Sequence, residues 1–181
     1  MNQLGTFMDA RRKVLADIQN FLATVRGISA TPVETAEAGI AMLIKLRQET
    51  YEDLNQIQHE HMIVSAAEWL VTKSRCPVDT VWAWNPRQTG NDSEPDLRGE
   101  HMGVVIVSAE ITTSESPIGT IDTRMRDTLK KLSSMKGERF YFARTESMCQ
   151  RAQTKAMKAG WRIEVVHLEP PALSQAAGAD R

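Results

Sequence analysis

Residues 104–112 form a nearly unbroken apolar run rich in β-branched side chains, VVIVSAEIT, and this run constrains the fold more than any other segment. A strand of this composition is typical of a sheet that is buried on both faces. Near its end the run carries a carboxylate, Glu110. Burying a carboxylate costs free energy unless a cation or hydrogen-bond donors satisfy it. The run therefore predicts a central strand that holds a charged group in place.

The hydrophobic period changes at Pro77, and the second half of the chain alternates strands with helices. Strands are predicted at residues 78–84, 97–100, 104–112, 139–144 and 161–168, and helices at residues 121–136 and 145–159. The element order is helix, strand, strand, strand, helix, strand, helix, strand. This order favours an α/β fold with a central mixed sheet flanked by helices.

The first half of the chain reads as helix. An apolar stripe marks a first helix that ends at Gly27, and Thr31-Pro32-Val33-Glu34 is a start signal for the next. The stretch that follows, to about Lys73, is either two helices or one helix with a bend near residues 58–61. Its own stripe is expected to pack on the first helix as an antiparallel hairpin: Ala36, Ile40, Leu43 and Ile44. We expect a helical extension at residues 1–57, a core domain at 58–169 and a mobile tail at 170–181.

Composition excludes several classes of protein. With 181 residues, 41% of them hydrophobic, the chain can bury a core without a staple, and its two cysteines exclude a disulfide framework or a Cys-rich zinc module. No apolar run is long enough to span a membrane and the N-terminus lacks a signal-like segment, so we expect a cytoplasmic protein. The sequence has no phosphate-binding glycine loop, GxSxG or HExxH motif, so no nucleotide cofactor is expected.

The net charge of −1 conceals a strong asymmetry. Residues 121–163 hold eleven Lys and Arg against four acids, whereas residues 34–60 hold six acids and two bases. Basic residues on consecutive helices suit a nucleic-acid backbone. The alternative is that they only balance the acidic half on a solvated face. The candidate nucleic-acid contacts are Arg126, Lys130, Lys136, Arg151 and Lys155.

A second carboxylate is predicted to lie near Glu110. A turn centred near Met102 places Asp96 within about two residues of facing Glu110, and the strand period puts Thr112 on the same face as Glu110. Two converging carboxylates form a hard-oxygen site suited to Mg²⁺. The alternative is that Asp96 only begins a turn and that Glu110 pairs with an arginine.

These residues resemble the motif of the PD-(D/E)xK nuclease superfamily, also called restriction-endonuclease-like. The similarity lies in Pro95-Asp96, then Glu110-Ile111-Thr112 closing an apolar strand, then a basic helix and another strand, and it covers about residues 59–168. The resemblance implies a core of helix, three strands, helix and strand. It implies Asp96 and Glu110 as metal ligands, with the Ile111 carbonyl as a further one. A third acid would come from the first core helix, where Glu60 and Glu68 are candidates and Glu68 is favoured.

The sequence departs from this family at Thr112, which stands where the family has a lysine that orients water and stabilises charge on the phosphate. Arg124 and Lys131 share one flank of the following helix and are candidate substitutes, unless both are simply solvated. Arg124 is favoured because it lies in the early turns of the helix, near the carboxylate end of the strand. His59 and His61 flank Glu60 but point in different directions, so they are not expected to form a metal pair.

The resemblance implies a Mg²⁺-dependent endodeoxyribonuclease, of restriction type, with Mn²⁺ as a possible substitute. In this interpretation the catalytic residues are Asp96, Glu110, Thr112, Arg124 and Lys131, and the partner is DNA. The helical extension either forms a homodimer or contacts flanking DNA. Two alternatives stay open. One is an inactive relative that binds nucleic acid or a protein, and the other is an assembly adaptor that acts through residues 1–57.

Overall fold

The computed structural model describes residues 1–85 and 93–169. Most of the predicted loop before Glu94 and all of the predicted tail lie outside these ranges. The fold is α/β with a mixed sheet, as the sequence predicts, and the sheet has six strands rather than the five predicted. The elements in chain order are β1 (Asn2–Gln3), α1 (Phe7–Ser29), α2 (Ala36–Thr72), β2 (Val81–Trp84), β3 (Leu97–His101), β4 (Val104–Thr112), α3 (Thr120–Ser133), β5 (Glu138–Ala143), α4 (Glu146–Ala159) and β6 (Glu164–His167).

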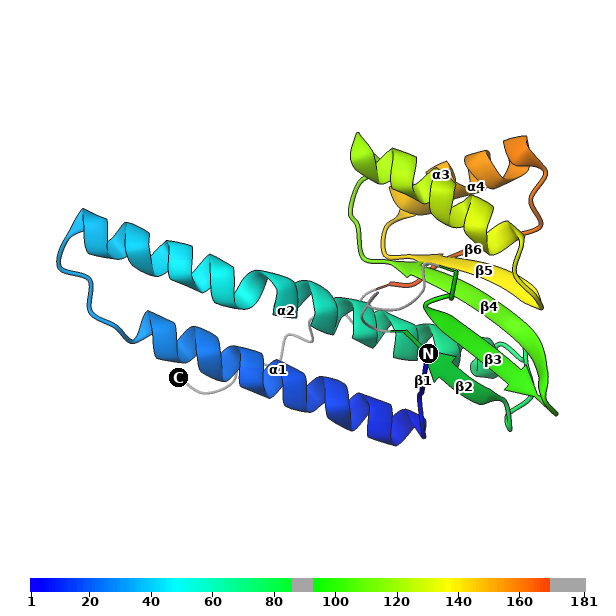
Figure 1. Ribbon diagram of the computed structural model, residues 1–181, viewed down its shortest axis with the longest axis horizontal. Coiled ribbons are helices and arrows are strands. Elements are labelled where there is room, and N and C mark those ends of the chain that lie inside the picture. The colour runs from blue at the N-terminus through cyan, green and yellow to red at the C-terminus, as the bar shows by residue number, and fades with distance from the viewer. Residues whose placement is uncertain (86–92, 170–181) are drawn as a thin grey trace, which may run out of the picture.

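The strands lie in the sheet in the order in which they occur along the chain, β1 to β6. Neighbouring strands from β1 to β4 are antiparallel, while β4, β5 and β6 are parallel. The C-terminal part of α2 covers one face of the sheet, and α3 and α4 cover the other (Figure 1). The strand β4 is therefore buried between two helical layers, which explains its continuous apolar sequence.

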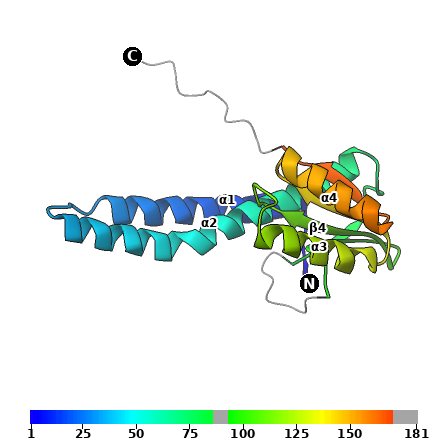
Figure 2. The ribbon, with the colours of Figure 1, turned by 90° about the horizontal axis from the view of Figure 1, so that it is seen from above.

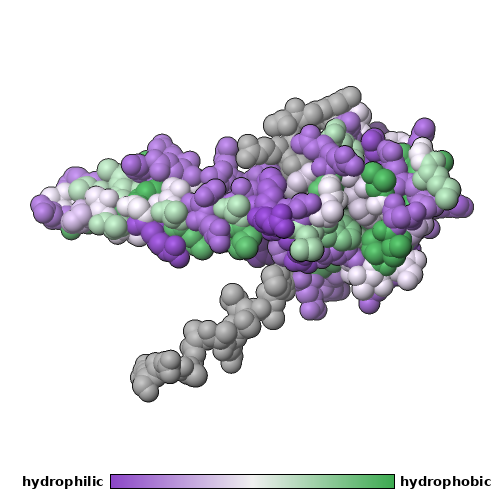
Figure 3. Space-filling view, turned by 90° about the horizontal axis from the view of Figure 1, so that it is seen from below, coloured by the Kyte–Doolittle hydropathy of each residue, from purple (hydrophilic) through white to green (hydrophobic). Residues whose placement is uncertain are grey.

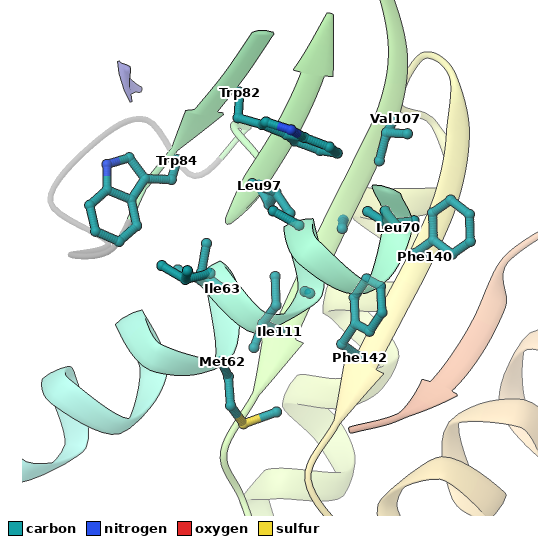
Figure 4. Packing of buried hydrophobic residues seen from close by; sticks show 14 of the residues in the cluster. Met62, Ile63, Leu70, Trp82, Trp84, Leu97, Val107, Ile111, Phe140 and Phe142 are labelled. Carbon is teal, nitrogen blue, oxygen red and sulfur yellow. The ribbon is translucent and has the colours of Figure 1, made fainter. Parts of the chain in front are cut away.

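Successive side chains of β5 point alternately to the α2 side of the sheet and to the side of α3 and α4. Phe140 and Phe142 pack with the α2 side of the core, whereas Tyr141 and Ala143 pack with α3 and α4. On the α2 side, Ile63 and Leu70 meet side chains from β3, β4 and β5 (Figure 4). By the same alternation Ala109 and Ile111 of β4 point toward α2. The intervening Glu110 therefore points toward α3.

The helices α1 and α2 run antiparallel as a long hairpin that projects away from the sheet (Figures 1 and 2). α1 continues through Gly27 to Ser29, and α2 is one helix over its whole length rather than two. The predicted start at Thr31 is wrong, because Thr35 is the N-cap and its hydroxyl accepts a hydrogen bond from the backbone of Ala38. None of the helices in the described ranges has both the length and the apolar character needed to cross a bilayer.

The predicted packing of the hairpin is also wrong in one respect. Ile40, Leu43 and Ile44 are more than half exposed and do not form the seam with α1. The half-buried side chains of this part of α2 are those of Met42 and Leu46, which lie on a neighbouring face of the helix. An apolar stripe on a helix indicates a face suited to packing, but it does not identify the element that packs there.

The N-terminal residues belong to the sheet, which the sequence does not predict. Asn2 and Gln3 pair with β2, and Leu4 is buried in the α2-side core. A strand of two residues is too short to show a period, so no pattern marks it. The base of the hairpin is consequently attached to the sheet through both helices: residues 2–4 lead into α1, and the C-terminal part of α2 packs on the sheet.

Candidate functional site

A β-bulge in the β3–β4 hairpin brings the two carboxylates into register. Glu100 pairs with Val105, but Gly99 pairs with Val107, so Ile106 is an extra residue on β4. Beyond the bulge Leu97 pairs with Ala109, and the next positions along are Asp96 and Glu110. Residues directly opposite each other in an antiparallel pair point to the same face. Without the extra residue, Asp96 would face Ala109 and lie on the opposite face from Glu110.

Both carboxylates are buried, as the sequence predicts for Glu110: Asp96 is 3% and Glu110 is 2% exposed. The backbone N–H of Ile111 donates a hydrogen bond of 2.8 Å to Asp96 Oδ2. This bond holds the Asp96 carboxylate beside the backbone that carries Glu110. Asp96 is therefore not merely the first residue of a turn.

The environment of Glu110 opposes its ionisation. Burial first and the neighbouring Asp96 carboxylate second raise the pKa of Glu110, Lys131 and His59 lower it, and the net result is a rise from 4.5 to about 8. A bound cation would reverse this balance, because positive charge favours the ionised carboxylate. The chemistry of the site thus favours a cation between the two acids.

Lys131 of α3 is the cation that reaches Glu110, with its Nζ 2.7 Å from Glu110 Oε1. Nζ also donates to the backbone carbonyl of Glu94 at 3.3 Å. Arg124 lies on the same face of α3 and lines the same cavity, but its side chain makes no ion pair or hydrogen bond within the described ranges. The preference for Arg124 is therefore wrong in its geometry: residues 113–119 separate β4 from α3, so the start of the helix need not lie beside the end of the strand.

A cavity of about 770 Å³ opens in front of these groups. Among residues 1–85 and 93–169, its charged lining residues are four acids and two bases: Glu94, Asp96, Glu110, Asp127, Arg124 and Lys131. The excess of acids makes the cavity more attractive to a cation than to a free anion. A phosphate would enter such a cavity most readily together with a cation.

Thr112 and Tyr141 form the polar wall on the sheet side of the cavity. The Thr112 hydroxyl accepts a hydrogen bond from the backbone of Ser114 at 3.2 Å. Burial raises the pKa of Tyr141 and the neighbouring Thr112 hydroxyl lowers it by less, so the Tyr141 hydroxyl stays protonated. Tyr141 was not predicted as a site residue, because in the sequence it is one aromatic residue in an aromatic strand.

The residues present fit a divalent cation in one respect that the structure shows directly. Glu110 Oε1 is buried beside the Lys131 ammonium, and because a carboxylate oxygen has two lone pairs, one of them is left to offer a metal. No cluster of three or more metal-ligating side chains occurs in residues 1–85 and 93–169. The Ile111 carbonyl, which the resemblance implies as a ligand, belongs to a residue that lines the cavity.

The structure does not bring the predicted third acid to this site. Glu68 lies against α1, where Arg11 Nε donates to its Oε1 at 2.6 Å, and Glu60 binds Lys13 and Gln56. Neither glutamate lines the cavity. Both instead join α2 to α1, a role that could not be predicted before the packing of α1 was known.

His59 is the residue of α2 that reaches the site, and the sequence analysis did not select it. Its Nε2 lies 3.4 Å from Asp96 Oδ2, on the oxygen that also accepts from Ile111. The predicted helix was correct, but the residue is one position before Glu60. In the sequence, His59 is considered only as half of a metal-binding pair with His61. A contact between His59 alone and Asp96 has no signal in the sequence.

Some of the predicted nucleic-acid contacts form ion pairs within the protein. Arg151 Nε and Lys155 Nζ bind Asp122 at 2.7 and 3.1 Å, which ties α4 to α3. Arg126, Lys130 and Lys136 are exposed. Fewer basic side chains are therefore available to a ligand than the number of Lys and Arg in residues 121–163 indicates.

Comparison with known proteins adds no relative. No family model, no curated protein and no solved structure matches this chain.

Proposed function

We propose that the chain is a Mg²⁺-dependent endodeoxyribonuclease of the PD-(D/E)xK type, in which Lys131 replaces the lysine that is missing at Thr112. The observation that carries the proposal is the buried Asp96–Glu110 pair with the Lys131 ammonium 2.7 Å from Glu110, at the wall of a cavity. The order α2, β2, β3, β4, α3, β5 supports it, because this is the order that the resemblance implies for the core.

The metal would be held by Asp96, the free lone pair of Glu110 Oε1 and the backbone carbonyl of Ile111. When bound, Mg²⁺, or Mn²⁺ in its place, supplies positive charge that acidifies a water and neutralises the scissile phosphate. DNA hydrolysis then forms one bond from the water oxygen to phosphorus and breaks one phosphoester bond.

The other residues of the cavity have separate roles in this proposal. Lys131 stabilises negative charge on the phosphate and orients the attacking water, because its ammonium is a compact donor on a flexible stem. Arg124 binds a neighbouring phosphate through its planar guanidinium. Thr112 orients Tyr141 and the start of the loop after β4. His59 fixes the Asp96 carboxylate from the side of α2.

Nicking of supercoiled plasmid tests this function. In the presence of Mg²⁺ we expect the wild type to nick, and Asp96→Asn and Glu110→Gln to lose activity by roughly 100-fold or more, because the metal site is lost. Lys131→Gln should lose about 100-fold through the loss of transition-state charge stabilisation. The matched control is Lys73→Gln, an exposed lysine at the end of α2 that does not line the cavity, which should stay within about twofold of the wild type.

The outcomes separate the competing interpretations. Activity that survives in both carboxylate variants, or that needs no divalent cation, contradicts the proposal. If Arg124→Gln abolishes nicking while Lys131→Gln does not, the assignment of Lys131 is wrong. Tight DNA binding by a wild type that cuts with neither Mg²⁺ nor Mn²⁺ identifies the chain as an inactive relative.

A further inference from the structure

The projecting hairpin has a thin packed seam. In α1 the buried residues are Ala10, Val14 and Ile28, and in α2 burial begins only at Glu60. The first half of α2 therefore packs against α1 along one edge and leaves most of its surface open (Figure 1). A helix pair of this kind gains little stability from its own interface.

Large apolar side chains occupy part of that open surface. On α1 they are Leu15 and Leu22, spaced by one heptad, and on the first half of α2 they are Ile40, Leu43, Ile44, Tyr51 and Leu54. These seven side chains are between 41% and 61% exposed. We call them the hairpin face. Apolar patches are visible along the hairpin in Figure 3.

The two stripes lie on the same side of the hairpin. On α1, Leu15 and Leu22 each follow a seam residue, Val14 and Phe21, by one position, which turns them by about 100° around the helix. On α2 the stripe is turned in the same sense from Met42 and Leu46. Because α2 runs antiparallel to α1, turns of the same sense bring both stripes to one side. The hairpin face is therefore a continuous apolar strip shared by two helices.

We propose that the hairpin face is covered by a second copy of this chain, so that two hairpins form a four-helix bundle. The area fits: seven side chains exposed to this extent offer roughly 700 Å² per protomer, close to the ~800 Å² per partner of a standard interface. A strip shared by two antiparallel helices is also nearly symmetric about its own midline. Such a strip is suited to an isologous contact, in which the same patch meets itself.

Sedimentation equilibrium of the full chain, with no DNA or metal present, tests this proposal independently of nuclease activity. We expect the wild type to have twice the mass of one chain at micromolar concentration. Leu15→Glu/Leu22→Glu should sediment as a monomer, because charges then face each other across the contact. The matched control is Ala16→Glu/Ala23→Glu, which adds the same charges to exposed positions one residue later on α1, and it should stay dimeric.

Circular dichroism of each variant shows whether the helices are kept. A monomeric wild type overturns the proposal and leaves the face to a different partner, as the adaptor interpretation requires. A dimer that persists in the folded Leu15→Glu/Leu22→Glu variant also overturns it, since the contact then lies elsewhere. Loss of the dimer in the Ala16→Glu/Ala23→Glu control would show that the opposite side of α1 forms the interface.

Discussion

Glu110 is the residue on which the site depends, because it is held in a state that costs free energy. In the unfolded chain water molecules solvate its carboxylate. In the folded protein Lys131 contacts one carboxylate oxygen and the Asp96 carboxylate lies nearby. A carboxylate with a raised pKa is a common sign of a functional site rather than of a structural ion pair. The same shift makes the stability of the protein depend on pH.

Glu110 should destabilise the metal-free protein as the pH rises. Its pKa is about 8 in the fold and 4.5 when unperturbed, so the folded state binds the proton more tightly. The stabilisation is complete below pH 4.5 and is lost as the pH rises toward 8. Urea unfolding in a chelating buffer at pH 5, 7 and 9 should show a falling free energy of unfolding for the wild type, relative to Glu110→Gln.

The matched control for this prediction is Glu52→Gln, an exposed glutamate of α2, whose difference from the wild type should not change with pH. Adding Mg²⁺ should stabilise the wild type more at pH 9 than at pH 5, since the ligands must be ionised to bind it. Parallel stability curves for the wild type and Glu110→Gln would contradict the assigned pKa.

At the scale of elements, the bulge in β4 and the turn before β5 support each other. Gly137 has a φ of +76°, and a Cβ at this position would lie 2.4 Å from the carbonyl carbon of Ile106 and 2.7 Å from the nitrogen of Val107. Ile106 is the extra residue of the bulge. The glycine therefore permits a close backbone approach at the place that sets the register of Asp96 and Glu110.

Gly137→Ala should be strongly destabilising, by roughly 2–4 kcal/mol, because backbone atoms must move to admit the methyl group. The matched control is Gly160→Ala, which also has a positive φ but has open space around its Cβ position, and it should cost about 1 kcal/mol. Equal losses for the two variants in chemical denaturation would show that the contact with the bulge is unimportant.

The sequence predicts helices and strands well where a hydrophobic pattern extends over many residues. It predicts poorly the features that depend on how distant segments pack together. The bounds of β4 and the caps of α4 agree with the sequence prediction, because a continuous apolar run and a Thr145 N-cap are local signals. The bulge at Ile106 has no local signal, and the prediction placed Asp96 only within about two residues of Glu110. The choice between Arg124 and Lys131 depends on the path of residues 113–119, and the contact of His59 depends on the direction of α2.

At the scale of the whole molecule, the hairpin links stability to association. If two hairpin faces pack together, unfolding separates two chains, and the melting temperature must depend on protein concentration. We expect the wild-type melting temperature to rise by a few degrees between about 2 and 100 μM. The Leu15→Glu/Leu22→Glu variant should melt at one temperature throughout, and a wild type that does the same would argue against a dimer.

The order of the sheet has a consequence for how the protein folds. Each strand of the sheet pairs with the strand next to it in the chain, and the parallel strands β4, β5 and β6 are joined by the single helices α3 and α4, whereas α1 and α2 both lie between β1 and β2. Strand pairing over short sequence distances, as from β3 to β6, favours rapid folding of that part of the sheet. Asp96, Glu110 and Lys131 all lie within one hairpin and the helix that follows it, so this contiguous stretch can assemble its chemistry before the rest of the chain docks. Of the ion-pair partners of the two carboxylates among the described residues, His59 is the one that precedes the β3–β4 hairpin and must reach it from α2.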